Sequence, residues 1–249
     1  MAGSPAPLLT LLLPGLDGTG QLFSRFLGAA NGALEFRALS YSRDVFQGYD
    51  ALEELVRREL PRKRRFALLG ESFSGPIALR IAAKGPPGLV AVVLATTFHR
   101  RPARQAVHVL WPLVPLFFRM PLPPHVVRLL LAGTEAPDDL VAEVRSATGS
   151  VKASVMAARA LEALRVDATE ALRACPVPIL FLGGKRDRLL RRDLAREVRA
   201  LRPDARIEML DGPHLLLQSR PIGAMRVVSE FLLRCASEHR GQAVSAKDE

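Results

Sequence analysis

The most constraining feature of this 249-residue chain is a short turn between an apolar strand and a helix. Apolar residues 66–69 lead into the segment GESFSG at residues 70–75, and a helix-like run follows it. In a G-x-S-x-G turn of this kind the serine lies at the tip, with a strained backbone and an exposed hydroxyl. Strand and helix nearly touch there, so the positions two before and two after Ser72 must be small. Gly70 and Ser74 meet that requirement, although Ser74 stands where glycine is usual.

A serine at such a turn becomes a nucleophile only with a base to take its proton and an acid to orient that base. Both residue types follow along the chain, each directly after an apolar strand. Asp187 lies in the loop after the strand expected at residues 177–182. His214 lies in the loop after the strand expected at residues 206–210. The order serine, aspartate, histidine, each following a strand, is that of the α/β-hydrolase fold.

On this turn and this order of residues, the chain resembles an α/β-hydrolase over essentially its whole length. The resemblance implies an α/β fold with a mostly parallel central sheet flanked by helices. It also implies that a helical cap is inserted after the strand at about residues 89–96. In the active site, it implies a catalytic triad of Ser72, Asp187 and His214.

The family also has an oxyanion hole, in which backbone N–H groups face the developing negative oxygen. By resemblance, Phe73 supplies the donor that follows the nucleophile. The other donor is Leu16, in the segment PGLDGTG at residues 14–20 after the first apolar strand. Pro14 stands where the family often has a histidine that braces this loop. Asp17 is a candidate to brace it instead, and also a candidate substrate contact.

Composition favours one α/β domain, because 249 residues with 49% hydrophobic side chains can bury a full core. Cys175 and Cys235 fit neither a metal nor a disulfide pattern, which indicates a reducing compartment. No apolar stretch has the length of a membrane span. The apolar run at residues 7–13 has no basic residue before it, so it is interpreted as a strand and not as a signal peptide. We therefore expect a cytoplasmic protein.

The net charge of +10 raises the question of nucleic-acid binding. Against this, the arginines are spread along the chain and no nucleic-acid recognition motif is present. The densest basic run, residues 62–65, falls between a helix and a strand, where a solvated turn is the simpler account. We therefore predict no nucleic-acid partner.

The segment between the strand at 89–95 and the next central strand is long and rich in proline and apolar residues. Helices are expected there at residues 126–131, 138–147 and 151–164. Apolar and charged residues alternate around Arg159, which predicts helices with one packed and one wet face. The predicted division is an α/β-hydrolase core at 1–98 and 167–236, a helical cap at 99–166, and a disordered tail at 237–249.

Three aromatic residues are candidate substrate contacts. Tyr41 follows the short strand at residues 36–39, at the edge of the sheet where ligands bind, although a solvent-facing position is the simpler account. Trp111 and Phe117 belong to the expected cap. They either line an acyl or hydrocarbon pocket or fill the small core of the cap, and the pattern favours neither.

The resemblance implies a serine hydrolase that cleaves a small-molecule carboxylic ester or thioester through an acyl-enzyme, with an apolar acyl group. It calls for no cofactor and no metal. Ser72 separates the chain from relatives that use an aspartate nucleophile. Acyltransferases share the triad. Residues 13–20 resemble bacterial hydrolases of unassigned substrate and, more loosely, the hydrolase part of plant plastid esterase/acyltransferases, so acyl transfer to an alcohol stays open. A non-catalytic protein that binds a small ligand is the alternative from another class.

Overall fold

The computed structural model describes residues 7–102 and 114–245, and its centre is a six-stranded sheet in the order β2-β1-β3-β4-β5-β6. Every neighbouring pair of strands is parallel, which confirms the predicted sheet. The strands are β1 (Leu9–Leu13), β2 (Glu35–Ala38), β3 (Phe66–Glu71), β4 (Leu89–Ala95), β5 (Ile179–Gly184) and β6 (Arg206–Leu210). All of their carboxyl ends therefore meet at one edge, where ligands bind in sheets of this type.

The four inner strands are buried at every residue, whereas the edge strands β2 and β6 are partly exposed. This burial explains the unbroken apolar runs in the sequence, because a parallel strand covered on both faces has no solvent side. One face is covered by α2 (Tyr49–Arg58), α3 (Gly75–Ala83), α8 (Thr169–Ala174) and α9 (Leu194–Leu201). The other is covered by α1 (Ser24–Gly28), α10 (Leu216–Ser219) and α11 (Pro221–Ser245).

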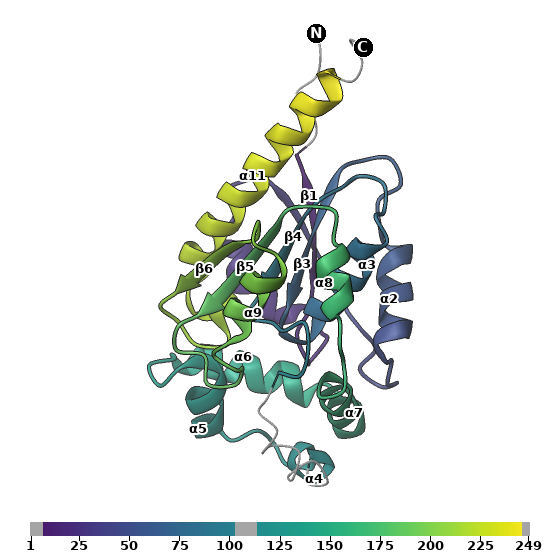
Figure 1. Ribbon diagram of the computed structural model, residues 1–249. Helices are drawn as coiled ribbons and strands as arrows, with labels where there is room; N and C mark the ends of the chain where they lie inside the picture. Colours follow the sequence, from purple (N-terminus) through teal and green to yellow (C-terminus); the bar gives the residue numbers. More distant parts are fainter. Residues whose placement is uncertain (1–6, 103–113, 246–249) are drawn as a thin grey trace.

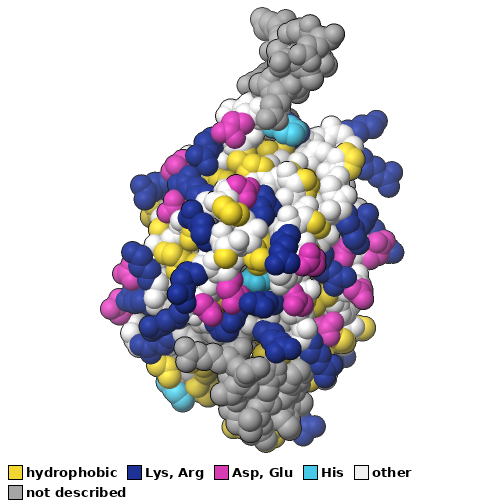
Figure 2. Space-filling model, in the orientation of Figure 1, with side chains coloured by type: hydrophobic (Ala, Val, Ile, Leu, Met, Phe, Trp, Pro, Cys, Tyr) yellow, Lys and Arg dark blue, Asp and Glu magenta, His cyan; other side chains and the backbone are white. Residues whose placement is uncertain are grey.

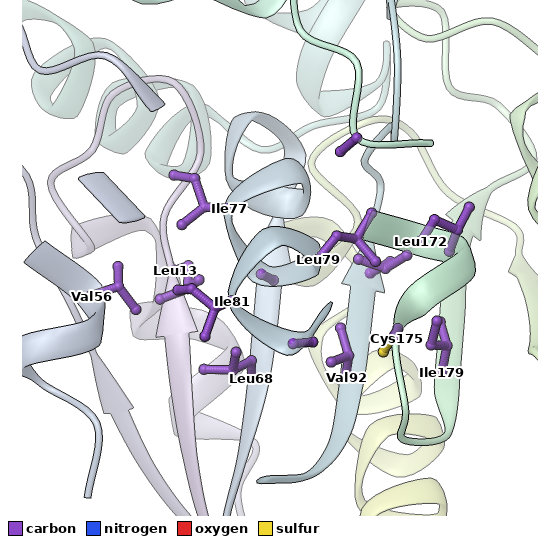
Figure 3. Close-up of a cluster of buried hydrophobic side chains, with 14 of the residues drawn as sticks. Leu13, Val56, Leu68, Ile77, Leu79, Ile81, Val92, Leu172, Cys175 and Ile179 are labelled. Atoms are coloured by element: carbon purple, nitrogen blue, oxygen red, sulfur yellow. The ribbon is translucent and has the colours of Figure 1, made fainter. Parts of the chain in front are cut away.

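Each face of the sheet has its own hydrophobic core. In the first core, Leu68 of β3 and Val92 of β4 pack among side chains of α3 such as Leu79 and Ile81 (Figure 3). All four are essentially inaccessible to solvent. Burying side chains of this size contributes about 1.5–3 kcal/mol each. The elbow between β3 and α3 is therefore anchored on both sides by packed structure.

The described residues between β4 and β5 include a group of helices, and we call residues 99–166 the insertion. Its described helices are α4 (Val114–Arg119), α5 (Pro124–Val126), the π-helical turn η4 (Val127–Ala132), α6 (Asp138–Gly149) and α7 (Ala153–Ala163). The three helices expected from the sequence correspond to η4, α6 and α7. In Figure 1 the helices α4 to α7 lie beyond the carboxyl ends of the strands, at the bottom of the view.

Helix α11 is longer than the sequence pattern predicts. It was expected to end near Cys235 before a disordered tail, but it continues to Ser245 and projects past the sheet (Figure 1). The prediction treated the lack of apolar residues as a stop. Polar residues such as glutamate, arginine and glutamine are good helix formers, and no proline interrupts the segment.

Cations on the visible surface are interspersed with acids. Figure 2 shows Lys and Arg side chains distributed over this face among Asp and Glu, without one dominant basic patch. Many are paired: Arg80, for example, contacts Asp50 and Glu53 of the neighbouring helix α2. Within the described residues, no helix has both the length and the apolar character needed to cross a membrane. Cys175 and Cys235 are buried free thiols.

Candidate active site

Ser72 lies at the tip of the turn between β3 and α3, at the start of the short 3-10 helix η2 (Ser72–Ser74). Its φ is 48°, a left-handed value that few residues with a side chain adopt. The hydroxyl of Thr97 donates a hydrogen bond to the carbonyl of Ser72 and helps to hold this conformation. A Cβ on Gly70 would lie 2.7 Å from the carbonyl oxygen of Ser74, so the close approach predicted from the sequence is present.

The structure brings Ser72, His214 and Asp187 together in one line of hydrogen bonds. Ser72 Oγ lies 2.9 Å from His214 Nε2, and His214 Nδ1 lies 2.8 Å from Asp187 Oδ2. His214 is buried, and the Asp187 carboxylate is nearly so. The ring can therefore take a proton from the serine on one side while the carboxylate holds its other nitrogen.

Several contacts keep Asp187 ionised. Burial alone would raise the pKa of this carboxyl. The neighbouring His214 and hydrogen bonds from the amides of Leu189 and Leu190 more than offset that effect, so the pKa lies below its ordinary value. The nearby arginines do not capture the carboxylate. Arg186, for instance, pairs with Asp211 at 2.9 Å.

Both segments expected to supply oxyanion donors adjoin Ser72. Phe73 follows it directly and is fixed by Tyr49, whose ring stacks on Phe73 at 4.8 Å and whose hydroxyl donates to its carbonyl at 3.1 Å. On the other side, a Cβ on Gly15 would lie 3.8 Å from the Cβ of Ser72. The amide of Leu16, the next residue, therefore lies near the nucleophile. We call the loop formed by residues 14–20 the oxyanion loop.

Asp17 and Tyr41, two of the candidate substrate contacts, are buried supports of this loop. The Asp17 carboxylate accepts hydrogen bonds from the amide and the hydroxyl of Thr19, which closes the loop on itself. The Tyr41 hydroxyl lies 2.8 Å from the hydroxyl of Ser74. Burial raises the pKa of Tyr41 well above its ordinary value, so the phenol stays protonated. Both residues therefore support the oxyanion loop from buried positions.

Ser74, which replaces the usual glycine, links the elbow to the oxyanion loop and to Tyr41. Its hydroxyl donates to the carbonyl of Pro14, at the start of the oxyanion loop, and lies within hydrogen-bonding distance of the Tyr41 hydroxyl. The two departures from the family pattern, Pro14 and Ser74, therefore contact each other. The unusual residue at position 74 was the sequence signal for this contact.

Arg159 of α7 contradicts the expected wet face, because its side chain is fully buried. It donates hydrogen bonds to the carbonyls of Leu16, Asp17 and Ser42. The helical pattern could not identify it, because an arginine between apolar residues is normally a surface residue.

Glu71, immediately before the nucleophile, is a second residue that the sequence analysis missed. It is buried, and burial raises the pKa of its carboxyl to about 7. Nε2 of Gln218 donates a hydrogen bond to it at 2.8 Å and opposes part of that rise. A carboxyl that titrates near neutrality thus lies beside the site.

The aromatic candidates of the insertion fall in different places. Trp111 lies outside the described residues. Phe117 is half exposed and packs edge-to-face on Phe118, with ring centres 5.4 Å apart. Phe118 in turn joins an apolar cluster with Leu16 and three buried residues, Val151, Val155 and Met156. An apolar wall of the insertion therefore adjoins the oxyanion loop.

Three solved structures illustrate the likeness of this fold to known ones. The chain superposes on a lipase-esterase related protein from Clostridium acetobutylicum with a TM-score of 0.76, at 14% identity over 91% of this chain and 95% of the other. A membrane phospholipase A described as a bacterial virulence factor superposes with a TM-score of 0.73, at 22% identity over 94% of this chain and 81% of the other. An enol-lactonase from Burkholderia xenovorans superposes with a TM-score of 0.73, at 19% identity over 94% of this chain and 94% of the other.

Sequence comparison identifies the family. No curated protein matches the chain. A family model described as the alpha/beta hydrolase family matches residues 6–226, which include the elbow at Ser72, the loop of Asp187 and the loop of His214. That match spans most of the sequence and agrees with the parallel sheet and the strand–turn–helix geometry. The chain therefore belongs to the alpha/beta hydrolase family.

Proposed function

We propose that this protein is a serine hydrolase that cleaves a small-molecule carboxylic ester or thioester through an acyl-enzyme. The observation that carries the proposal is the continuous contact from Ser72 Oγ to His214 Nε2 at 2.9 Å and from His214 Nδ1 to Asp187 at 2.8 Å. A base within reach of a strained, positioned serine is what nucleophilic catalysis requires. Family membership supports the same reaction class.

The first half of the reaction forms the acyl-enzyme. Nε2 of His214 takes the hydroxyl proton while Ser72 Oγ attacks the carbonyl carbon. The carbonyl oxygen gains negative charge and is stabilised by the amides of Leu16 and Phe73. Asp187 holds His214 in the tautomer whose Nε2 is free and stabilises the imidazolium that forms. The imidazolium then gives its proton to the leaving alcohol or thiol, and the acyl group stays on Ser72.

The second half releases the acid. His214 takes a proton from a water molecule, which attacks the acyl carbon through a second oxyanion held by the same two amides. The proton then returns to Ser72 as its ester bond breaks. Each cycle consumes one ester and one water and yields one acid and one alcohol or thiol. An added alcohol that replaces water at this step would make the protein an acyltransferase.

The proposed substrate carries an apolar acyl group, and the proposed cap is the insertion at residues 99–166. Phe118 and the cluster around Met156 form an apolar wall against Leu16, beside the proposed oxyanion site. Lipase-esterase, phospholipase and lactonase, the names of the similar structures, all denote proteins that act on ester bonds.

Labelling with a fluorophosphonate probe tests the proposal directly. Wild type should be labelled, whereas Ser72→Ala and His214→Ala should not be, with circular dichroism showing that both variants are folded. Hydrolysis of acyl esters of varied chain length should fall by about 10⁶ in Ser72→Ala, as in proteases that use the same chemistry. Labelling at a residue other than Ser72, or substantial hydrolysis by folded Ser72→Ala, would refute the assignment. Product analysis with added alcohol separates hydrolase from acyltransferase.

A further inference from the structure

The most unusual residue outside the proposed triad is Arg159, in the middle of α7. Its side chain is the largest in the described residues that is fully buried. A charged group is rarely buried to this degree without a carboxylate partner, because removing it from water is costly. Among the described residues, Arg159 forms no salt bridge, and its hydrogen bonds go to three backbone carbonyls.

Two of those carbonyls belong to the oxyanion loop. Nη1 of Arg159 donates to Leu16 O at 3.0 Å and to Asp17 O at 2.8 Å. Nη2 donates to Ser42 O at 2.8 Å, in the loop that follows β2. The guanidinium also lies over the Tyr41 ring, 5.6 Å from its centre. One planar group thus holds two loops at fixed angles, as a rigid fork of donors can.

The loop is shaped to receive this guanidinium. Gly18 has a φ of 69°, and a Cβ there would lie 2.5 Å from Nη1 of Arg159. Any other residue at position 18 would both strain the backbone and displace the arginine. The close approach of Arg159 therefore explains why Gly18 of the PGLDGTG segment is a glycine.

The remaining carbonyls at the head of the loop are also held. Pro14 O accepts the hydroxyl of Ser74, and Gly15 O accepts the amide of Gly18 at 3.0 Å. Because each peptide unit is planar, fixing Gly15 O also fixes the direction of the Leu16 N–H. Arg159 holds the next two units and so keeps the turn from rotating about Leu16.

We infer that Arg159 is a positioning residue for the oxyanion hole: it fixes the Leu16 amide from the side of the insertion. This inference rests on the proposed serine hydrolase function. It makes the donor dependent on the position of α7, because a displacement of that helix would remove Arg159 from Leu16 O and Asp17 O and leave the Leu16 amide held only through the Gly15 O–Gly18 N hydrogen bond. The insertion is then part of the catalytic geometry, in addition to any contact with substrate.

The test compares Arg159→Met with Arg159→Lys and with Lys152→Met as the matched control. Methionine keeps an unbranched apolar stem, although a shorter one, and removes every side-chain donor. Lysine keeps the charge but cannot span three carbonyls with one ammonium group. Lys152 is a cation at the start of the same helix, and its ammonium pairs with the exposed Asp44 at 3.2 Å. Its replacement should leave the kinetics unchanged.

Arg159→Met should lower kcat by up to about 10²–10³, the effect of losing one oxyanion donor outright, with little change in KM. Binding of a boronic acid, which mimics the tetrahedral intermediate, should weaken by a similar factor. Arg159→Lys should fall between Arg159→Met and wild type, and it serves as the test variant if methionine prevents folding. A purely structural arginine would lower the melting temperature but leave kcat and boronate affinity intact below it, which would overturn the inference.

Amide hydrogen exchange separates this inference from the proposed function. Peptides covering residues 14–20 should exchange faster in Arg159→Met than in wild type or Lys152→Met. If wild type fails to react with the fluorophosphonate, the proposed function is wrong, and the exchange measurement still decides whether Arg159 holds the loop. Unchanged exchange in a folded variant would contradict the inference whatever the probe shows.

Discussion

Nε2 of Gln218 donates a hydrogen bond to the carboxyl of Glu71 at 2.8 Å. Glu71 directly precedes Ser72 in the sequence. Both side chains are almost completely buried. Burial raises the pKa of Glu71 to about 7, and this hydrogen bond offsets only part of the rise. The described structure therefore favours a protonated carboxyl at this position below neutral pH.

Replacing Glu71 with glutamine should change how stability depends on pH. The folded pKa of about 7 lies above the ordinary value of 4.5, so the stabilisation is complete below 4.5 and is lost as pH rises towards 7. Wild type should lose up to roughly 3 kcal/mol relative to Glu71→Gln between pH 4.5 and pH 8. Urea unfolding of both proteins at these two pH values measures the difference, from which the other titrating groups cancel. Parallel pH profiles would contradict the proposed titration.

Ser74→Ala should destabilise the protein by about 1–3 kcal/mol, because it leaves the buried carbonyl of Pro14 and hydroxyl of Tyr41 without this partner. Tyr41→Phe removes one of these contacts and should cost about 1 kcal/mol. The double variant should cost less than the sum of the single effects, because the contacts share Ser74. Denaturant unfolding of the four proteins gives the coupling energy. Strict additivity would show that the two hydroxyls act independently.

The parts of the site that could be predicted from the sequence depend on local structure. Ser72, Asp187 and His214 each follow an apolar strand, and a parallel sheet brings the ends of its strands to one edge. The elbow needs small residues within a few positions of the serine, which a short motif can display. Geometry set by neighbouring residues is therefore readable from a single sequence.

The supports behind the site could not be predicted in the same way. Arg159 contacts Asp17 across 142 positions, and Gln218 contacts Glu71 across 147. No helical or strand pattern carries information about such pairs, and an arginine or glutamate is normally assigned to the surface. The end of helix α11 was also not predicted, because apolar content alone indicates a stop near Cys235 although the polar residues that follow it favour a helix.

Asp187→Asn should lower kcat by up to about 10⁴ while the protein stays folded, as the equivalent change does in a serine protease. The asparagine NH₂ would face His214 Nδ1 and favour the tautomer that carries its proton on Nε2, which cannot accept the serine proton. Pre-steady-state hydrolysis of an activated ester, with thermal unfolding as the control, measures the effect. A loss smaller than tenfold would show that Asp187 does not orient His214.

Gly70→Ala should damage both the fold and the reactivity of the elbow. The added Cβ would lie 2.7 Å from Ser74 O and 3.0 Å from the Cα of Gly75, and backbone atoms cannot step aside as a flexible side chain would. Overpacking of this kind costs about 1–3 kcal/mol or more, and it should move Ser72 enough to slow fluorophosphonate labelling. Gly28→Ala, at the end of α1 with no heavy atom within 4 Å of the new Cβ, is the matched control. It should be neutral or stabilise by up to about 1 kcal/mol. Wild-type stability and labelling in Gly70→Ala would mean that strand and helix are not in close contact at this turn.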